Sequence, residues 1–408
     1  MPWGRTALLG CLLSSLLVIP ASPSPSAEAE HQPREHQADQ LLQAQNMSVV
    51  RRKPRLPQLS IASPTAAPVA SPTIRPTTSP TVAPGAGPTV SPAAGPTTGP
   101  TVGPTTSPVA VAGTLGSQVR FGAFAGGFTS TGSQVAQFEQ QLGSRLSIAS
   151  SFRGVGDVFP AGEQLTDAAS GHTLLISWDM GSTVSQRFST YTKGGHDTYL
   201  RSVAAAARGF GAPIYLRPWA EMNGDWSTFQ PTTDGSRPAG GTPGEFKAAW
   251  QHVVTVFRAA GATNVRWVFN PTTDTYAETT DIRTIFPGSN YVDVLGLDGY
   301  NWGTGGVFTW RSFADIYTVQ YQRLLALAPT LPVWICEVGS KQPLVHDGSP
   351  IDPANSKAAW YKDALSSKAF PAITALVMFD IRKERDWRVG SDPATLQTVA
   401  AAVRAGMG

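Results

Sequence analysis

The 408-residue sequence predicts an α/β fold: a (β/α)8 TIM barrel over residues 113–408, preceded by a signal peptide and a disordered Pro/Thr/Ser-rich linker. Eight short apolar runs recur in residues 113–408. Most are continuous rather than alternating, as expected for parallel strands that are buried on both faces. Stretches with apolar residues at helical spacing separate them, and eight such units suit a barrel of roughly 250 residues with longer loops. An open doubly wound sheet is the alternative, although no Gly-rich phosphate loop follows the first run.

The N-terminus has the pattern of an export signal over residues 1–27. Arg5 is followed by an apolar run at 7–19, which is short for a membrane span of about 20 residues. Small residues at 21–27 would suit cleavage. We therefore expect a secreted, extracellular protein without a membrane span after signal removal. Association with a cell wall is a further expectation.

Residues 28–112 are expected to form a disordered linker. Proline occupies every fourth position from Pro64 to Pro108, with mostly Thr, Ser, Ala, Val and Gly between. Such a segment has no apolar face to bury, and its prolines favour an extended polyproline II conformation. It would act as a stalk that holds the folded domain at a distance.

The barrel elements are expected in the following order. The eight predicted strands cover residues 119–123, 145–149, 173–178, 213–217, 265–269, 292–297, 332–336 and 373–379. Thr242 and Glu245 flank Pro243 in a capping box that predicts the start of a helix, and Asp352-Pro353 predicts a similar start. Helical spacing of apolar residues further predicts helices over 196–209, 312–327 and 393–404.

Charge and composition restrict the function. The chain has 31 Lys/Arg and 28 Asp/Glu, of which seven and four, respectively, lie in residues 1–112. Residues 113–408 therefore carry 24 charges of each sign. A balanced folded part gives no electrostatic reason to expect nucleic acid as a partner. Two cysteines exclude a disulfide-stapled scaffold. No His/Cys/carboxylate cluster has metal-ligand spacing, so we expect no metal and no cofactor.

Two carboxylates follow predicted strands at the end where a barrel has its active-site mouth. Glu221 comes after the fourth run and Glu337 after the seventh. A carboxylate pair in a cleft suits glycoside hydrolysis, in which one group is a protonated acid and the other is ionised. Arg217 could hold one of them charged, and Tyr300 could hydrogen-bond the nucleophile. For either Glu taken alone, a salt-bridged loop residue is the alternative.

Five tryptophans lie at predicted strand ends or in the loops beyond them: Trp178, Trp219, Trp226, Trp302 and Trp387. An exposed indole face stacks on the apolar face of a pyranose ring, so these residues are candidate sugar platforms. Packing under the loops is the alternative. Ser177 lacks the flanking glycines of a nucleophile elbow, which disfavours a Ser-His-Asp hydrolase.

Three separated blocks carry a family resemblance. They are RPWAEMNGDW at 217–226, WICEVG at 334–339 and FDIRKERDWR at 379–388, and Asp298-x-Tyr300 adds a weaker match. Together they resemble glycoside hydrolase family 26, which contains endo-β-1,4-mannanases and some β-1,3:1,4-glucanases and β-1,3-xylanases. The resemblance covers the chain from about residue 119 to the C-terminus.

The resemblance implies a retaining (β/α)8 hydrolase in which Glu221 is the general acid/base and Glu337 the nucleophile. It also implies that Arg217 and Asn223 are supports and that Trp387 is a platform beside the cleaved bond. In most members His precedes the acid/base, whereas Ala220 stands here. This departure puts the identity of the substrate in doubt without removing either carboxylate.

The resulting hypothesis is a monomeric, secreted, retaining endo-β-glycanase that acts on a β-linked polysaccharide, with β-1,4-mannan as the first expectation. A glucanase or xylanase of the same family is the alternative, as is a non-catalytic carbohydrate-binding wall protein. The residues expected to bind substrate are Arg217, Trp219, Asn223, Trp226, Trp178, Asp298, Tyr300, Trp302 and Trp387.

Overall fold

The computed structural model describes residues 119–126, 134–274, 279–305, 307–346 and 349–406. Within them, eight parallel strands form a closed barrel in the order of the sequence, and β1 pairs with β8 to complete it. The strands are β1 (Arg120–Ala125), β2 (Ile148–Gly154), β3 (Thr173–Asp179), β4 (Ile214–Pro218), β5 (Val265–Phe269), β6 (Val294–Asn301), β7 (Val333–Ser340) and β8 (Ile373–Asp380). The predicted barrel is therefore confirmed, and every predicted strand overlaps an observed one. The bounds of the second predicted strand are wrong, since β2 begins three residues later and ends five residues later than the predicted 145–149.

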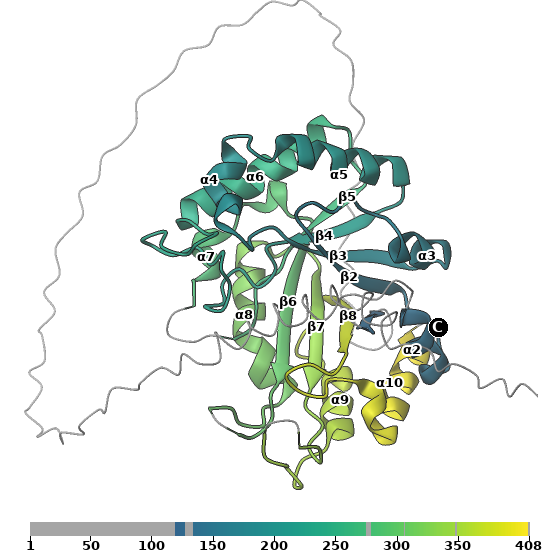
Figure 1. Cartoon of the computed structure of the whole chain (residues 1–408). Helices are drawn as coiled ribbons and strands as arrows, with labels where there is room; N and C mark the ends of the chain where they lie inside the picture. The colour runs from purple at the N-terminus through teal and green to yellow at the C-terminus, as the bar shows by residue number, and fades with distance from the viewer. Residues whose placement is uncertain (1–118, 127–133, 275–278, 306, 347–348, 407–408) are drawn as a thin grey trace, which may run out of the picture. The chain divides into compact units, whose positions relative to one another are not determined.

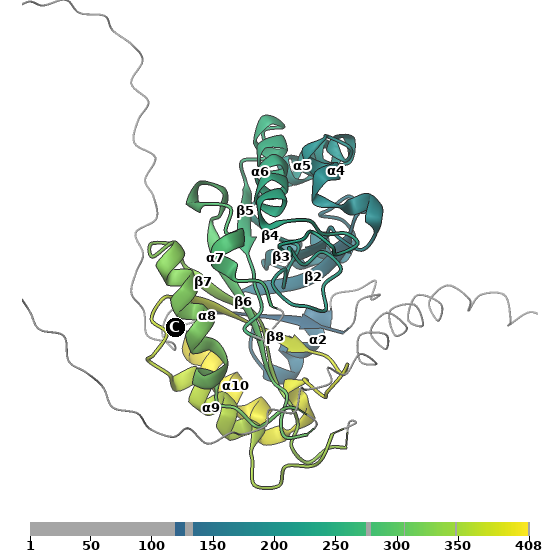
Figure 2. The same cartoon turned by 90° about the vertical axis from the view of Figure 1, so that its left-hand side faces the viewer.

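Helices lie around the outside of the barrel (Figures 1 and 2). They are α2 (Gln134–Leu142), α3 (Glu163–Ala169), α4 (Phe188–Thr192), α5 (Asp197–Phe210), α6 (Pro243–Ala259), α7 (Ile282–Ile285), α8 (Phe313–Leu327), α9 (Lys357–Ser366) and α10 (Pro393–Gly406). Short 3-10 turns occur at η1 (Val184–Gln186), η2 (Ser289–Tyr291) and η3 (Val389–Ser391). The helices predicted over 196–209, 312–327 and 393–404 correspond to α5, α8 and α10.

One predicted helix start is confirmed and one is wrong. Thr242 caps α6 by accepting a hydrogen bond from the Glu245 backbone, and the capping box is complete. Asp352-Pro353 does not begin a helix, because α9 starts at Lys357. The Asp352 carboxylate instead accepts a hydrogen bond from the Thr304 backbone at 2.9 Å, so it joins two loops rather than capping a helix.

Strands β6 and β7 extend four residues beyond their predicted ends, to Asn301 and Ser340. The added segments are polar or charged in part, which is why the apolar runs alone did not reveal them. In the register of the two strands, Asp298 lies opposite Glu337. Pairing therefore places two carboxylates side by side inside the barrel mouth.

The core is divided between the barrel interior and the layer beneath the helices. An inner cluster fills one end of the barrel and includes Leu175, Val268, Trp334 and Val377. A much larger cluster lies between strands and helices. A third, small cluster of Phe124, Phe379, Ile381 and Trp387 lies near the ends of β1 and β8. This arrangement leaves the mouth to polar and aromatic side chains.

The predicted signal peptide at 1–27 and linker at 28–112 lie outside the described residues, so both stay predictions. Among the residues that the structure does describe, no helix is long and apolar enough to cross a membrane.

Candidate active site

Glu221 lies in a tight turn that directly follows β4. Trp219 and Glu221 have φ values of 50° and 57°, in the left-handed region that costs side-chain-bearing residues roughly 1–2 kcal/mol each. Neighbouring strands hold this turn in place. The backbone N–H of Trp219 donates to the Trp178 carbonyl at 3.1 Å, and that of Glu221 donates to the Asn270 carbonyl at 2.8 Å. Strain of this kind, fixed by surrounding structure, is typical of functional positions.

Trp226 orients the carboxyl group of Glu221. Its indole Nε1–H donates a hydrogen bond to Glu221 Oε2 at 2.9 Å. Gly224 makes this approach possible, since a Cβ atom at that position would lie 2.5 Å from the Trp226 ring. The segment 221–226 thus works as one unit that aims the carboxyl group.

Glu337 is held by two donors from neighbouring strands. Arg217 Nη2–H donates to Glu337 Oε1, and the Tyr300 hydroxyl donates to Glu337 Oε2. Two donors on one carboxylate suit its ionised form and fix the direction of its oxygens. Glu337 is 8% exposed, so it is largely withdrawn from solvent.

Arg217 is completely buried and organises the floor of the site. Its Nη1–H group donates to both Asp298 oxygens, at 2.9 and 2.7 Å, and its Nε–H donates to Ser177 Oγ at 2.6 Å. Its guanidinium also lies 5.6 Å from the ring centre of Phe152. Burial would lower the pKa of Arg217, but the charges of Asp298 and Glu337 outweigh this effect and raise it. Arg217 therefore stays cationic.

The carboxyl groups of Glu221, Asp298 and Glu337 converge. One oxygen of each lies within 4.8 Å of the others. Three anions at this distance would repel one another strongly, and Arg217 compensates only part of that charge. Burial and the neighbouring Glu337 charge raise the pKa of Glu221 to about 8, whereas the Trp226 hydrogen bond opposes the rise. Burial also raises the pKa of Asp298, although the charge of Arg217 opposes this rise. Because Asp298 is fully buried against Arg217, the proton available to a substrate is expected on Glu221.

The pH dependence of turnover should follow from this proton. Glu221 must enter the first step protonated, so kcat/KM should fall as the pH rises through its pKa, which lies above neutrality. Trp226→Phe removes the hydrogen-bond donor that favours the ionised form of Glu221. The alkaline limb of the pH profile of kcat/KM should therefore move to higher pH. A Trp310→Phe variant is the control, because Trp310 is a partly buried tryptophan that precedes α8 and packs against the large core cluster, and it should leave the limb in place. A limb that stays fixed or moves down in Trp226→Phe would contradict this assignment.

Several residues expected to bind substrate are buried within the protein. Arg217, Trp219, Asn223 and Asp298 are 0% exposed and Trp178 is 1% exposed, so none of these side chains is open to a ligand in this structure and their expected contacts with substrate stay predictions. The two indoles pack outside the barrel wall, Trp178 against Phe159, Tyr199 and Phe257, and Trp219 against Phe188, Tyr191, Phe246 and Trp250.

Asn223 joins two loops of the mouth. Its side-chain amide donates to the Thr272 carbonyl at 3.1 Å and accepts from the Thr272 N–H at 2.8 Å. Because both polar ends of the amide are engaged, Asn223 fixes the turn after β4 against the segment after β5. These bonds give Asn223 a positioning role, and its expected contact with substrate stays a prediction.

The remaining aromatic residues form a wall beside Glu337. Tyr300 lies 4.8 Å from Trp387 and 6.1 Å from Trp302 between ring centres. Trp302 also stacks on Phe308 at 5.0 Å, and it is partly exposed, as is Trp226. Trp387 is only 1% exposed, so its expected role as a platform stays a prediction that requires covering neighbours to move.

Two residues of the site were missed by the sequence reasoning. Ser177 is opposite Arg217 in the β3–β4 register and accepts its Nε–H, although the sequence offered only its position in a strand. Asp274 follows β5, and burial raises its pKa to about 6 although the charge of Arg311 opposes this. No motif surrounds Asp274, so no sequence signal could have identified it.

Comparisons with known proteins identify the family. Residues 176–356, which include both Glu221 and Glu337, match the family described as glycosyl hydrolase family 26. The chain is also 32% identical over 302 residues to Endoglucanase H of Acetivibrio thermocellus, a match that covers 72% of this chain. The chain belongs to glycoside hydrolase family 26. The family expected from the three sequence blocks is thereby confirmed.

Another relative matches over a shorter stretch. Mannan endo-1,4-beta-mannosidase of Bacillus subtilis (strain 168) is 31% identical over 138 residues, or 32% of this chain. The alignments cover only 31% of the length of each of these two relatives. The solved catalytic domain of the Bacillus sp. JAMB-750 family 26 endo-beta-1,4-mannanase has a TM-score of 0.51 at 16% identity, covering 70% of this chain and 86% of that one. This structural likeness shows the shared fold alone.

Proposed function

We propose that this chain is a retaining, endo-acting β-glycanase that cleaves a β-linked polysaccharide. The observation that carries the proposal is the convergence of Glu221 and Glu337, whose nearest oxygens lie within 4.8 Å. Retaining glycosidases place their two carboxyl groups about 5–5.5 Å apart, whereas inverting enzymes leave about 6.5–9.5 Å for a water molecule. The separation favours double displacement.

The reaction assigns one role to each carboxyl group. A Glu337 oxygen attacks the anomeric carbon while Glu221 donates its proton to the departing glycosidic oxygen. The resulting glycosyl ester on Glu337 is then attacked by a water molecule that gives its proton to Glu221. The ester bond breaks, Glu337 is restored as an anion, and the sugar leaves with its original β configuration. Arg217 and Tyr300 hold the attacking oxygens in place.

We further propose a β-glucan as the preferred substrate. The match to Endoglucanase H extends over 302 residues, whereas the match to the Bacillus subtilis mannosidase extends over 138. Ala220, in place of the His that most family members carry before the acid/base, also weakens the case for mannan. β-1,4-Mannan is the second candidate because of that shorter match.

A substrate panel tests the proposal. Purified full chain is incubated with mixed-linkage β-glucan, cellulose derivatives, β-mannan and β-xylan, and the release of reducing ends is measured. The expected result is release from β-glucan with a rapid fall in viscosity, which indicates internal cleavage. Preferential release from mannan would support the second candidate. Binding without release from any polysaccharide would favour the non-catalytic carbohydrate-binding alternative.

Secretion is also proposed, on the basis of the export pattern at residues 1–27. It is tested by expressing the full chain in a secreting host and sequencing the N-terminus of the exported protein. A new N-terminus near residue 27 in the medium supports export, and an intact Met1 found only inside cells contradicts it.

A further inference from the structure

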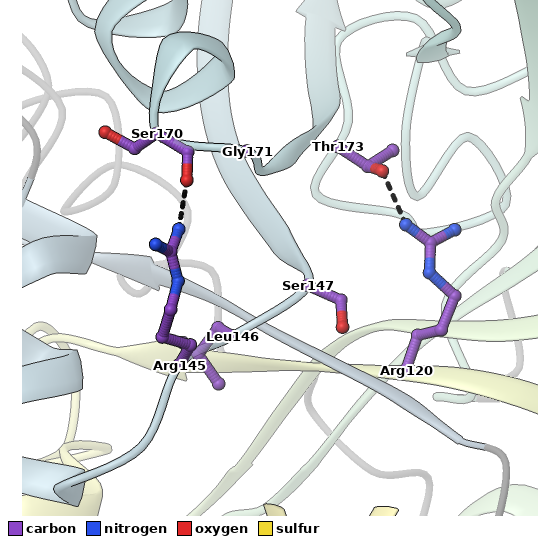
Figure 3. A pocket seen from close by; sticks show the side chains of 7 residues that line it. All are labelled: Arg120, Arg145, Leu146, Ser147, Ser170, Gly171 and Thr173. Carbon is purple, nitrogen blue, oxygen red and sulfur yellow. Dashed lines mark hydrogen bonds between the residues drawn. The ribbon is translucent and has the colours of Figure 1, made fainter. Parts of the chain in front are cut away.

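A cavity lies at the end of the barrel opposite Glu221 and Glu337. It has a volume of about 610 Å³ and is lined by Arg120, Arg145, Leu146, Ser147, Ser170, Gly171 and Thr173 (Figure 3). Arg120 and Thr173 are the first residues of β1 and β3, so the cavity is at the N-terminal ends of the strands. Glu221 follows the C-terminal end of β4, at the opposite end of the parallel barrel.

Two arginines extend along the two sides of this cavity, with Ser147 between them (Figure 3). Arg120 donates to Thr173 Oγ1 at 2.5 Å, and its guanidinium lies 5.4 Å from the centre of the Trp334 ring. Arg145 donates to the Ser170 carbonyl. Each guanidinium carries five N–H donors, so these bonds orient both groups while leaving donors for a ligand.

Neither guanidinium has an acidic partner in the part of the chain that the structure describes. The ion pairs there involve other basic residues, such as Arg217 with Asp298 and Arg153 with Glu163. Arg120 and Arg145 therefore place two positive charges beside the cavity. Guanidinium groups bind carboxylate and phosphate oxygens in bidentate geometry, and seryl hydroxyls add neutral donors and acceptors.

We propose that this cavity is a second, non-catalytic site that binds an acidic saccharide, with its carboxylate or phosphate group held by Arg120 and Arg145. The volume falls within the range of about 300–1,000 Å³ that is typical of sites for organic ligands, which favours a sugar over a lone inorganic ion. The hydroxyls of Ser147 and Thr173 offer partners for sugar hydroxyls. The site does not depend on the proposed hydrolysis, because its residues and those of the mouth lie at opposite ends of the strands.

The test uses the full chain and isothermal titration calorimetry. The probes are trigalacturonate, which carries carboxylates on a sugar, and inorganic phosphate, at an ionic strength of about 0.01 M to limit screening. Arg145→Gln and Arg120→Gln should each weaken trigalacturonate binding at least about tenfold, because each removes charge-assisted hydrogen bonds. Arg208→Gln is the matched control, since Arg208 is exposed and likewise donates to a backbone carbonyl, that of Ala260. It should bind like the parent chain.

All variants are compared in the full chain, so any binding of the probe to the basic run at residues 51–55 is the same in each and does not affect the comparison. Unfolding temperatures of the variants are measured alongside, since Arg120 covers Trp334 and its loss could disturb the barrel. Arg145 is exposed, so the Arg145→Gln result stands even if Arg120→Gln unfolds. Unchanged trigalacturonate affinity in Arg145→Gln would overturn the proposal. Phosphate binding as tight as trigalacturonate binding would overturn its saccharide part.

Discussion

Glu337→Ala is expected to reduce kcat/KM by more than about 10⁴-fold on every polysaccharide that the chain cleaves. The variant has no oxygen to attack the anomeric carbon, and no other described carboxylate can replace it, since Asp298 is fully buried and bonded to Arg217. Glu337→Gln is the matched variant, because it keeps the shape of the side chain and removes only its charge. Initial rates of reducing-end release provide the measurement.

Glu221→Ala provides the complementary result. It should reduce polysaccharide cleavage by about 10²–10⁴-fold, because proton donation to the leaving oxygen is lost. Aryl glycosides with an acidic phenol leaving group should be affected less, since that group needs no proton. Added azide should restore turnover in Glu221→Ala by attacking the glycosyl-enzyme without needing a base, and should yield a β-glycosyl azide. Polysaccharide cleavage by Glu337→Ala at the rate of the parent chain, with no azide added, would remove Glu337 from the mechanism.

Arg217→Met is expected to lower the free energy of unfolding by about 3–5 kcal/mol. The substitution leaves Asp298 and Glu337 buried without their cation, and the lost hydrogen bonds also include that to Ser177. Urea unfolding followed by tryptophan fluorescence measures the change. Arg201→Met, which breaks an exposed pair with Asp197, is the control and should change stability by no more than about 1 kcal/mol.

A double variant separates the two functions of Arg217. Asp298→Asn removes one of the uncompensated charges, so Arg217→Met combined with Asp298→Asn should be less unstable than the sum of the single variants. Activity should stay low in the double variant, because Glu337 still lacks its donor from Arg217. Additive losses of stability would contradict the proposed coupling between Arg217 and Asp298.

Much of the fold could be predicted because the barrel repeats one simple pattern. Most strands contain a continuous apolar run, and the Thr242–Glu245 box signals its helix through local contacts alone. The ends of β6 and β7 could not be placed in the same way. Their last residues alternate between the barrel mouth and the packed layer outside it, so polar residues such as Asp298 continue the strand rather than end it.

The positions of the two carboxyl groups were predictable, whereas the functions of their neighbours were not. Glu221 and Glu337 follow from strand order, since the C-terminal ends of barrel strands share one mouth. Whether an indole is exposed depends on which side of the wall it faces, and a residue's place in a turn does not decide this. Trp219 and Trp226 are seven residues apart in one loop, yet the first packs under a helix and the second binds Glu221. Asp352 likewise has the sequence of a helix cap but joins two loops.

The stereochemistry of the first product tests the central mechanism most directly. Proton NMR of the parent chain acting on a soluble β-linked oligosaccharide would record the anomeric signals before mutarotation. Because the oxygens of Glu221 and Glu337 approach within 4.8 Å, the account predicts that the β-anomer accumulates first and the α-anomer follows only as the products equilibrate. Initial accumulation of the α-anomer would show a single displacement by water and would contradict Glu337 as the nucleophile.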